Sequence, residues 1–400
     1  MKKIIAIIAV SVLALTMAFS VGCGKKEAGF RYNEKDFVNE IGGTSDTYEG
    51  AVSSESYDDA DSCAGNYVQN EVVGSKSANI VSVQAGSELT SAEVSAIGVS
   101  ASVLGDYEWV KKYNVTYTEN DTADGGITFM ADRDVSRTQA VYVVKYTDGG
   151  FKYIAPKPLN GETITSSYYE SLFNSEEYAN CTMTSTTKID LDISASYQGE
   201  KQKGTMTVSL NTLTKIDGDK IYLEVTTKAV YGDVLAQGGM PNVDQTVKAY
   251  IISTDNGYEL YFYDSDNGSW QSGTFSNVGL NSYRDLLPFV SMRDLDYTYY
   301  KKTDYGCEVD FGRMADYLMD SLGDELGAGM QYLDQMKIDG YAKLYVSRGV
   351  LSGAREYIDL SCNLEQQGVK AKISESALVE IVCNNYGTTV VDTSEVTGNN

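Results

Sequence analysis

The chain has 400 residues and a formal net charge of −24, which becomes −26 if Lys2 and Lys3 are removed with the first 22 residues, because those residues contain no acid. A surface of this charge repels nucleic acid and anionic lipid headgroups, so neither is expected as a partner of the bulk surface. The sequence contains no histidine, which excludes Ser-His-Asp and Cys-His catalysis and every histidine-based metal site.

The first 23 residues have the order of an export signal. Met1-Lys2-Lys3 is basic, Ile4–Val21 carries no charge, and Gly22 and Cys23 follow. The small residue before the cysteine resembles the lipobox of bacterial lipoproteins, in which the signal peptide is cut before an acylated cysteine. The resemblance implies removal of residues 1–22 and attachment of acyl chains to Cys23. Because one acyl chain binds only weakly, two or three are expected to hold the protein at the outer face of the cell membrane.

Two other interpretations of this segment stay open. Ala18-Phe19-Ser20 has small residues at the spacing that ordinary signal peptidase cuts, which would release a soluble protein. Ser20 also stands where lipoboxes usually have Leu. The apolar run is about long enough to span a membrane as an uncleaved anchor. We prefer lipidation, and the whole pattern is similar to lipoproteins of Gram-positive, clostridial-type envelopes.

Residues 23–55 are rich in Gly, Ser, Glu and Asp and show little periodicity, so we expect a flexible spacer with a short helix near Asp36–Ile41. A small domain is expected over residues 56–158. Apolar residues at three-and-four spacing predict a helix that begins at Ser56 or Asp58 and ends at Gly74. A shorter helix is predicted at Thr90–Ile97, where Glu93 stands at capping-box spacing from Thr90.

The same domain should contain an antiparallel sheet. Alternating residues and turn signals predict five strands: Ile80–Ala85, Trp109–Glu119, Ile127–Ala131, Gln139–Tyr146 and Phe151–Ala155. A long helix on such a sheet has a cystatin-like or NTF2-like outline, and this outline implies no activity. Pro156-Lys157-Pro158 ends the last strand, so the domain boundary is expected between there and residue 165.

A larger domain is expected over residues 166–396, starting with a helix at Ser166–Phe173. From Cys181 to Tyr197, residues of one parity are mostly apolar and those of the other are polar, which predicts a strand with one face in a core. Further strands are predicted at Met206–Leu210, Ile221–Tyr231, Val247–Ile252, Tyr258–Tyr263, Trp270–Phe275, Tyr297–Val309, Ile338–Val346, Glu356–Leu364, Val369–Ile373 and Leu378–Asn384. Tight turns between them indicate antiparallel pairing. Leu280–Val290 and Phe311–Leu326 predict helices.

Residues 174–396 resemble the LolA/LppX-type lipoproteins. The resemblance is carried by the order of four features: Ile189–Tyr197, Asp217–Tyr222, Tyr261–Asp264 leading to Trp270, and Asn385–Val391. It implies a large curved antiparallel half-barrel with helices on its concave face, enclosing an apolar cavity that carries lipid or acyl chains. The expected fold class is therefore α+β, with a small helix-plus-sheet domain followed by this half-barrel.

Five cysteines follow Cys23, and their number is odd. None forms a Cys-x-x-Cys pair, so a zinc or redox site is not expected, and the alternation favours buried free thiols, although one disulfide in the larger domain stays open. They are Cys63, Cys181, Cys307, Cys362 and Cys383.

No cofactor, metal site or catalytic residue is predicted. Asp264–Gly268 has the composition of a calcium loop, but its glycine and its twelfth position do not fit an EF-hand, so a solvated turn is favoured. Tyrosines such as Tyr297, Tyr299, Tyr300 and Tyr305 are able to stack on sugars, but packing within a tyrosine-rich sheet is favoured.

Two functions stay open for a chain of this kind. The preferred one is a membrane-anchored extracellular lipoprotein without catalytic activity, whose larger domain binds a lipid or another apolar ligand. The alternative is a cell-envelope interaction module that binds protein or glycan through tyrosine-rich surfaces. A hydrolase is disfavoured because no nucleophile motif or histidine is present.

Overall fold

The computed structural model describes most of the chain after residue 29. The described residues are 30–120, 136–173, 175–197, 200–232, 242–254, 257–265, 267–275, 295–312, 314, 336–366 and 369–397. Within them the protein is mostly β and contains two large antiparallel sheets, neither of which is closed. The predicted strand Ile127–Ala131, the predicted helix Leu280–Val290 and most of the predicted helix Phe311–Leu326 lie outside the described residues.

The chain divides into two compact units. The small unit comprises Ser45–Asn174 and Leu295–Cys307, and the large unit comprises Met1–Thr44, Ser175–Asp294 and Glu308–Asn400. These bounds differ from the sequence prediction in the spacer, which is divided between the two units after Thr44, and at two later places. The helix Ser166–Phe173 and residues 295–307 belong to the small unit, because their apolar side chains pack there and local periodicity does not record tertiary neighbours.

The small unit is a five-stranded sheet in the order β1-β5-β4-β3-β2. Its strands are β1 (Ala51–Val52), β2 (Ser77–Glu88), β3 (Tyr107–Asn120), β4 (Arg137–Tyr146) and β5 (Phe151–Ala155). On one face α3 (Ala60–Tyr67) continues into a π-helical turn, Val68–Val73, and ends at Gly74 with φ 72°. The predicted helix is thus confirmed, although its N-cap is Asp59, whose side chain accepts from the Ser62 N–H.

Both faces of the small sheet are covered. Tyr113, Val115 and Tyr117 of β3 point toward α3 and are buried with Cys63 and Val141. The other face packs against α4 (Ser91–Ala96) and α5 (Ala101–Leu104). The predicted capping box of α4 is present: Glu93 N–H donates to Thr90 Oγ1, and Thr90 N–H donates to Glu93 Oε2.

Two further segments complete the small unit. The helix α6 (Ser166–Phe173) buries Tyr168, Tyr169, Leu172 and Phe173, at the bounds that the sequence predicts. Residues 295–307 form a 3₁₀ turn (Tyr297–Tyr299), β12 (Tyr300–Lys302) and the start of β13 (Gly306–Val309). The single strand predicted over Tyr297–Val309 is therefore wrong, because a turn at Thr303–Gly306 interrupts it.

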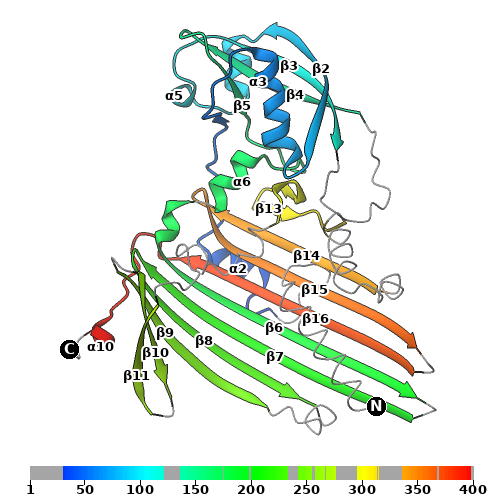
Figure 1. The fold of residues 1–400 in the computed structure, drawn as a ribbon, viewed down its shortest axis with the longest axis vertical. Coiled ribbons are helices and arrows are strands. Elements are labelled where there is room, and N and C mark those ends of the chain that lie inside the picture. Colours follow the sequence, from blue (N-terminus) through cyan, green and yellow to red (C-terminus); the bar gives the residue numbers. More distant parts are fainter. Residues whose placement is uncertain are drawn as a thin grey trace. The chain divides into compact units, whose positions relative to one another are not determined.

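The large unit contains nine described strands in the order β11-β10-β9-β8-β7-β6-β16-β15-β14 (Figure 1). They are β6 (Asn180–Tyr197), β7 (Glu200–Asp217), β8 (Lys220–Tyr231), β9 (Val243–Thr254), β10 (Gly257–Asp264), β11 (Ser269–Phe275), β14 (Met336–Ser347), β15 (Val350–Gln366) and β16 (Val369–Asn384). All adjacent pairs are antiparallel, and the C-terminal β16 closes beside β6. Short helices flank the sheet: a 3₁₀ turn at Glu176–Ala179 and α10 (Ser394–Thr397).

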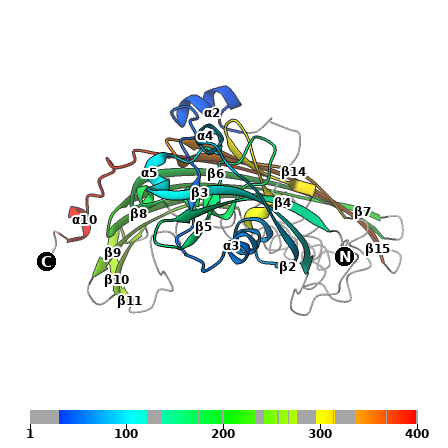
Figure 2. The same cartoon turned by 90° about the horizontal axis from the view of Figure 1, so that it is seen from above.

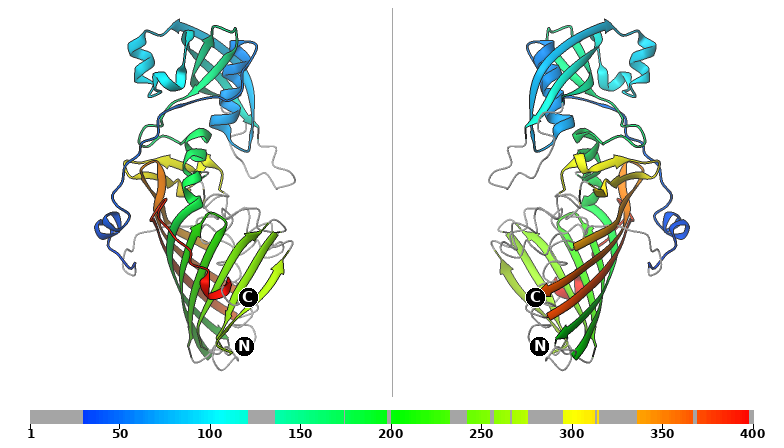
Figure 3. Two further views of the ribbon diagram at one scale, coloured as in Figure 1. Left: turned by 90° about the vertical axis from the view of Figure 1, so that its left-hand side faces the viewer. Right: turned by 90° about the vertical axis from the view of Figure 1, so that its right-hand side faces the viewer.

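The large sheet is strongly curved, and its two faces differ (Figure 2). Helix α2 (Glu34–Glu40) lies on the convex face, where Phe37 is fully buried. Figure 3 shows the same helix outside the curve of the sheet from both sides. The expected spacer is therefore structured from Glu34 onward, because Phe37 and Ile41 provide apolar side chains for docking and Gly353 leaves room for them.

Candidate functional site

The predicted attachment site does not fall within the described part of the chain. Both Gly22 and Cys23 precede residue 30. Among the described residues, no helix is long and apolar enough to cross a membrane. The predicted acylation of Cys23 therefore stays a prediction.

The five later cysteines are all buried, and each is a thiol that takes part in no disulfide. Burial raises the pKa of the Cys63 and Cys181 thiols to about 12, so very little reactive thiolate forms at neutral pH. The prediction of buried thiols that pack as small hydrophobic residues is confirmed. Among the described residues, no group of acids and cysteines is arranged to hold a metal ion.

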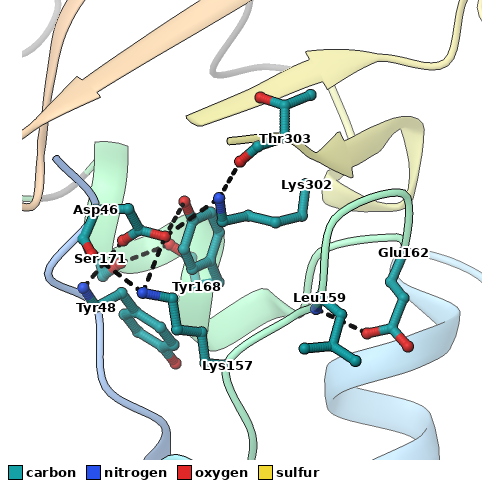
Figure 4. Close-up of polar contacts among 9 residues, drawn as sticks. All are labelled: Asp46, Tyr48, Lys157, Leu159, Glu162, Tyr168, Ser171, Lys302 and Thr303. Atoms are coloured by element: carbon teal, nitrogen blue, oxygen red, sulfur yellow. Dashed lines mark hydrogen bonds and ion pairs between the residues drawn. The ribbon is translucent and has the colours of Figure 1, made fainter. Parts of the chain in front are cut away.

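A buried ionic cluster lies in the small unit (Figure 4). The Asp46 carboxylate lies 3.3 Å from the Nζ atoms of both Lys157 and Lys302, accepts from the Tyr48 N–H and accepts from the Tyr168 hydroxyl at 3.3 Å. Burial opposes ionisation of Asp46, but the Tyr48 N–H and the two ammonium groups outweigh it and lower the pKa. Every charge drawn has a partner, so the cluster ties four segments together and offers no reactive group.

A second buried carboxylate in the small unit has the same character. Glu71, in the π-helical turn, accepts hydrogen bonds from the N–H and hydroxyl of Ser167, at 2.8 and 2.9 Å, and from the Tyr153 hydroxyl at 3.3 Å. It thereby caps the first turn of α6, because those N–H groups have no helical partner. We interpret Glu71 as a structural contact.

The predicted tyrosine cluster is packed within the small unit. Tyr297 and Tyr300 are buried, and their rings lie 6.4 and 6.0 Å from the ring of Tyr169. The Tyr297 hydroxyl donates to the Asn70 carbonyl and accepts from the Gly74 N–H. Sugar stacking at these two rings is excluded because they have no exposed face.

The concave face of the large sheet is apolar. It carries the side chains of one parity from every strand, and on β6, β7 and β16 these pack as one cluster: Leu191, Ile193, Ala195, Met206, Ala371 and Ile373. Toward the β11 edge, Val247 and Phe262 lie on the same face with 48% and 44% of their surface exposed. Exposed apolar side chains on a curved sheet are a surface on which an apolar ligand can be buried.

Two carboxyls interrupt this apolar face. On β16, Glu375 lies between Ile373 and Ala377. On β15, Glu356 pairs in register with Val379 of β16. Both are only 2% exposed, and among the described residues neither oxygen of Glu375 nor Oε2 of Glu356 has a hydrogen-bond partner. Burial raises the pKa of Glu375 to about 8 and that of Glu356 well above its usual range. Both groups are thus held largely as neutral acids at neutral pH.

Sequence reasoning missed these two acids, although one signal was available. Glu375 has the parity of Ile373 and Ala377, so a strand drawn through it places a carboxyl on the apolar face. The prediction of two strands, Val369–Ile373 and Leu378–Asn384, is wrong, because β16 runs unbroken through Ser374-Glu375-Ser376. A polar run at the centre of a strand looks like a turn when its neighbours are unknown.

Asp264 acts in a turn. Its carboxylate accepts from the backbone N–H of Asn267 at 3.2 Å and from the side-chain amide of Asn267 at 2.5 Å. These bonds close the β10–β11 hairpin, as the interpretation of a solvated turn requires.

Comparisons with known proteins do not assign a family. No family model matches the chain, and no curated protein matches it. A solved structure of a DUF1329 family protein from Desulfovibrio piger aligns with 58% of this chain and 97% of its own length, at 12% identity and a TM-score of 0.19.

Proposed function

We propose that the protein is an extracellular lipoprotein, held at the outer face of the cell membrane by acyl chains on Cys23, in which the large sheet binds a lipid or another apolar ligand. It acts by binding and not by catalysis. The observation that carries the proposal is the apolar concave face, where Val247 and Phe262 are about half exposed. Because each side chain is already about half buried, covering the rest of it with a ligand contributes about 1 kcal/mol.

The finer description of the fold belongs to the same proposal. In it, the large unit is an open half-barrel of the LolA/LppX type and the small unit is a separate domain. Support comes from the unbroken antiparallel order from β11 to β14 and from the curvature of that sheet (Figure 2).

Ligand binding is tested with a fluorescent fatty acid, cis-parinaric acid, and the chain without its signal peptide carrying Cys23→Ser. Saturable binding is expected, and the double substitution Val247→Ser and Phe262→Ser should weaken it at least fivefold. Val230→Ser is the matched control, since Val230 is 56% exposed but lies on the convex face. Absence of saturable binding, or equal loss in the control, contradicts the proposal.

Anchoring is tested separately in cells of the source bacterium. Growth with labelled palmitate should label the native chain, and Cys23→Ala should abolish the label and release the protein into the medium. A mature chain that begins before Cys23 and has the plain peptide mass would contradict anchoring, and would leave the ligand-binding result unaffected.

One observation favours the alternative of an envelope interaction module. Four aromatic rings form a row on the convex face at β8 to β11, with centroid separations of 5.0, 5.1 and 5.3 Å: Tyr222, Tyr250, Trp270 and Tyr263. Tyr263 is 37% exposed and offers an edge for stacking. Specific retention of a glycan on an array, lost with Tyr263→Ala and Trp270→Ala, would favour this function.

A further inference from the structure

Four lysines form a compact group on the convex face of the large sheet. Lys203 and Lys372 both pair in register with Ser194, and Lys201 and Lys370 both pair with Ser196. The two lysines that pair with one serine therefore lie on the strands on either side of β6, about 10 Å apart. The pair at Ser194 and the pair at Ser196 are about 7 Å apart along the strands. We call these four residues the lysine patch; all four are exposed.

The lysine patch surrounds a pocket. The pocket has a volume of about 630 Å³, and it is lined by the four patch lysines, by Ser194, Ser196 and Asn363 between them, and by the intervening strand residues Ala195, Gln202 and Ala371. Small serines between long lysines leave a hollow with donors at its rim. It lies where the β6–β7 and β15–β16 hairpins end side by side (Figure 1).

The charge of the lysine patch contrasts with the rest of the molecule. Two acids stand at neighbouring register positions, Asp192, which lies 3.1 Å from Lys203, and Glu365, which pairs with Lys370 in the strand register. The local balance is therefore positive, in a chain whose net charge is −24. At an ionic strength of 0.1 M, charges more than about 10 Å away are largely screened, so the patch attracts anions locally.

The N-terminal segment runs toward the lysine patch on the same face. Phe37 packs against Tyr345, with ring centroids 5.0 Å apart, whereas the earlier residue Phe30 stacks on Tyr341 and lies under the Arg355 guanidinium. Going back along the chain from Phe37 to Phe30 thus moves along the strands toward the hairpin ends. Tyr341 is level with Leu378, and Lys372 is six residues further along β16.

The chain length before Phe30 is sufficient to reach the patch. Cys23 precedes Phe30 by seven residues, which span up to about 24 Å when extended. The distance from Leu378 to Lys372 along the strand is about 20 Å. An acyl anchor on Cys23 and the lysine patch can therefore meet one membrane surface.

We infer that the lysine patch binds phosphate groups of anionic lipids in the membrane that carries the anchor, and so turns the hairpin ends of β6–β7 and β15–β16 toward the bilayer. The inference rests on the proposed function for the anchor at Cys23. Lysines near an anionic surface are attracted to its phosphate groups, and the attraction adds over the four residues. Because the anchor makes this second contact intramolecular, a weak interaction is enough to orient the unit.

In the experiment, a lipid coupled chemically to Cys23 takes the place of the natural acyl anchor. In the mature chain Cys23 is coupled to a maleimide lipid in vesicles of phosphatidylcholine alone or with 30% phosphatidylglycerol, and lysines are acetylated with a membrane-impermeant reagent and quantified by mass spectrometry. We expect the patch lysines to react at least threefold more slowly on the phosphatidylglycerol vesicles at 0.1 M salt, and the difference to disappear at 1 M salt. Lys215, Lys220, Lys228 and Lys248, which lie on the same face of β7 to β9 at least about 20 Å along the strands from the patch, are the control, and their reactivity should not change between the two vesicles.

Three results would overturn the inference. One is equal reactivity of the lysine patch on both vesicles, and another is equal protection of the control lysines. The third is protection by soluble heparin but not by anionic vesicles, which would assign the patch to a soluble polyanion. None of these readouts depends on ligand binding at the concave face or on acylation in cells, so failure here is distinguishable from failure of the proposed function.

Discussion

The Nε atom of Arg355 on β15 lies 3.4 Å from Oε1 of Glu380 on β16, and the two side chains are only 1% and 3% exposed. The Arg355 guanidinium also donates to the Tyr32 carbonyl at 2.7 Å and lies 4.1 Å from the centre of the Phe30 ring. Burial raises the pKa of Glu380, and Arg355 acts in the opposite direction. This ion pair holds the N-terminal segment against the convex face.

Arg355→Met should strongly destabilise the large unit. It leaves Glu380 buried without its counter-charge, and loss of one partner of a buried pair costs about 3–5 kcal/mol. Urea unfolding followed by Trp270 fluorescence in a Trp109→Phe background reports the large unit, because Trp109 and Trp270 are the two tryptophans of the chain.

The exposed ion pair Lys228–Asp244 provides the control for this measurement. Its atoms lie 2.9 Å apart and its side chains are 57% and 66% exposed. Lys228→Met should therefore cost less than about 1 kcal/mol. Losses of similar size in the two variants would show that Arg355 and Glu380 do not form an energetically coupled buried pair.

Alternation in the sequence was sufficient to predict most strands of the large sheet. From Cys181 to Ala195 the buried residues have the predicted parity, and the turn at Asp217-Gly218-Asp219 joins β7 to β8 as expected. Such patterns are readable because one face of these strands is polar and the other apolar. The capping box at Thr90 is readable for a similar reason, since its contacts are local.

The alternation of apolar and polar residues did not predict strand residues that are buried on both faces of the sheet. The predicted strand Glu356–Leu364 omits the first six residues of β15, Val350–Arg355, which are buried on both faces. Arg355 is buried on the convex side, where Phe30 and Phe37 lie against its guanidinium, and Ser352 and Glu356 are buried on the concave side. No local pattern records that a helix some 315 residues earlier packs on this strand, so neither Glu356 nor the docking of α2 was predictable.

Gly353→Ala and Gly65→Ala should change stability in opposite directions. A Cβ atom at Gly353 would lie 2.7 Å from the Ile381 carbonyl oxygen and 2.8 Å from Cζ of Phe37, so α2 would have to move off the sheet. We expect a loss of about 1–3 kcal/mol. At Gly65, inside α3, the nearest atom is Ile80 Cγ1 at 3.5 Å, and the helix should gain about 0.5–1 kcal/mol.

The free energy of unfolding of each glycine variant is measured in urea by tryptophan fluorescence, with Trp270 for Gly353→Ala and Trp109 for Gly65→Ala. Stabilisation by Gly353→Ala would show that α2 does not need close contact with β15. Hydrogen exchange at Phe37–Ile41 gives a second readout, and should become faster in Gly353→Ala only.

The five buried cysteines should be unreactive in the native protein. With Cys23→Ser present, we expect Ellman's reagent to modify them at least 100-fold more slowly than after unfolding in guanidinium chloride, because reagent access and thiolate formation are both suppressed. Val390→Cys, at a position that is 73% exposed, is the positive control. A native thiol that reacts as fast as this control would contradict the burial of that cysteine.

Glu375→Gln should remove a pH dependence from the stability of the large unit. Because burial raises the pKa of Glu375 from its ordinary value of 4.5 to about 8, the folded state keeps a proton that the unfolded state releases between these pH values. The free energy of unfolding of the unsubstituted protein should therefore fall as pH rises from about 4.5 to about 8, relative to Glu375→Gln, and level off above that range. At about 1.4 kcal/mol per pKa unit, the relative loss is on the order of 3–5 kcal/mol.

Urea unfolding of both proteins at pH 5, 6.5 and 8 measures this loss, and the difference between the two proteins isolates Glu375 from the other buried acids. A difference that stays constant, or grows with pH, would mean that Glu375 is ionised in the folded protein.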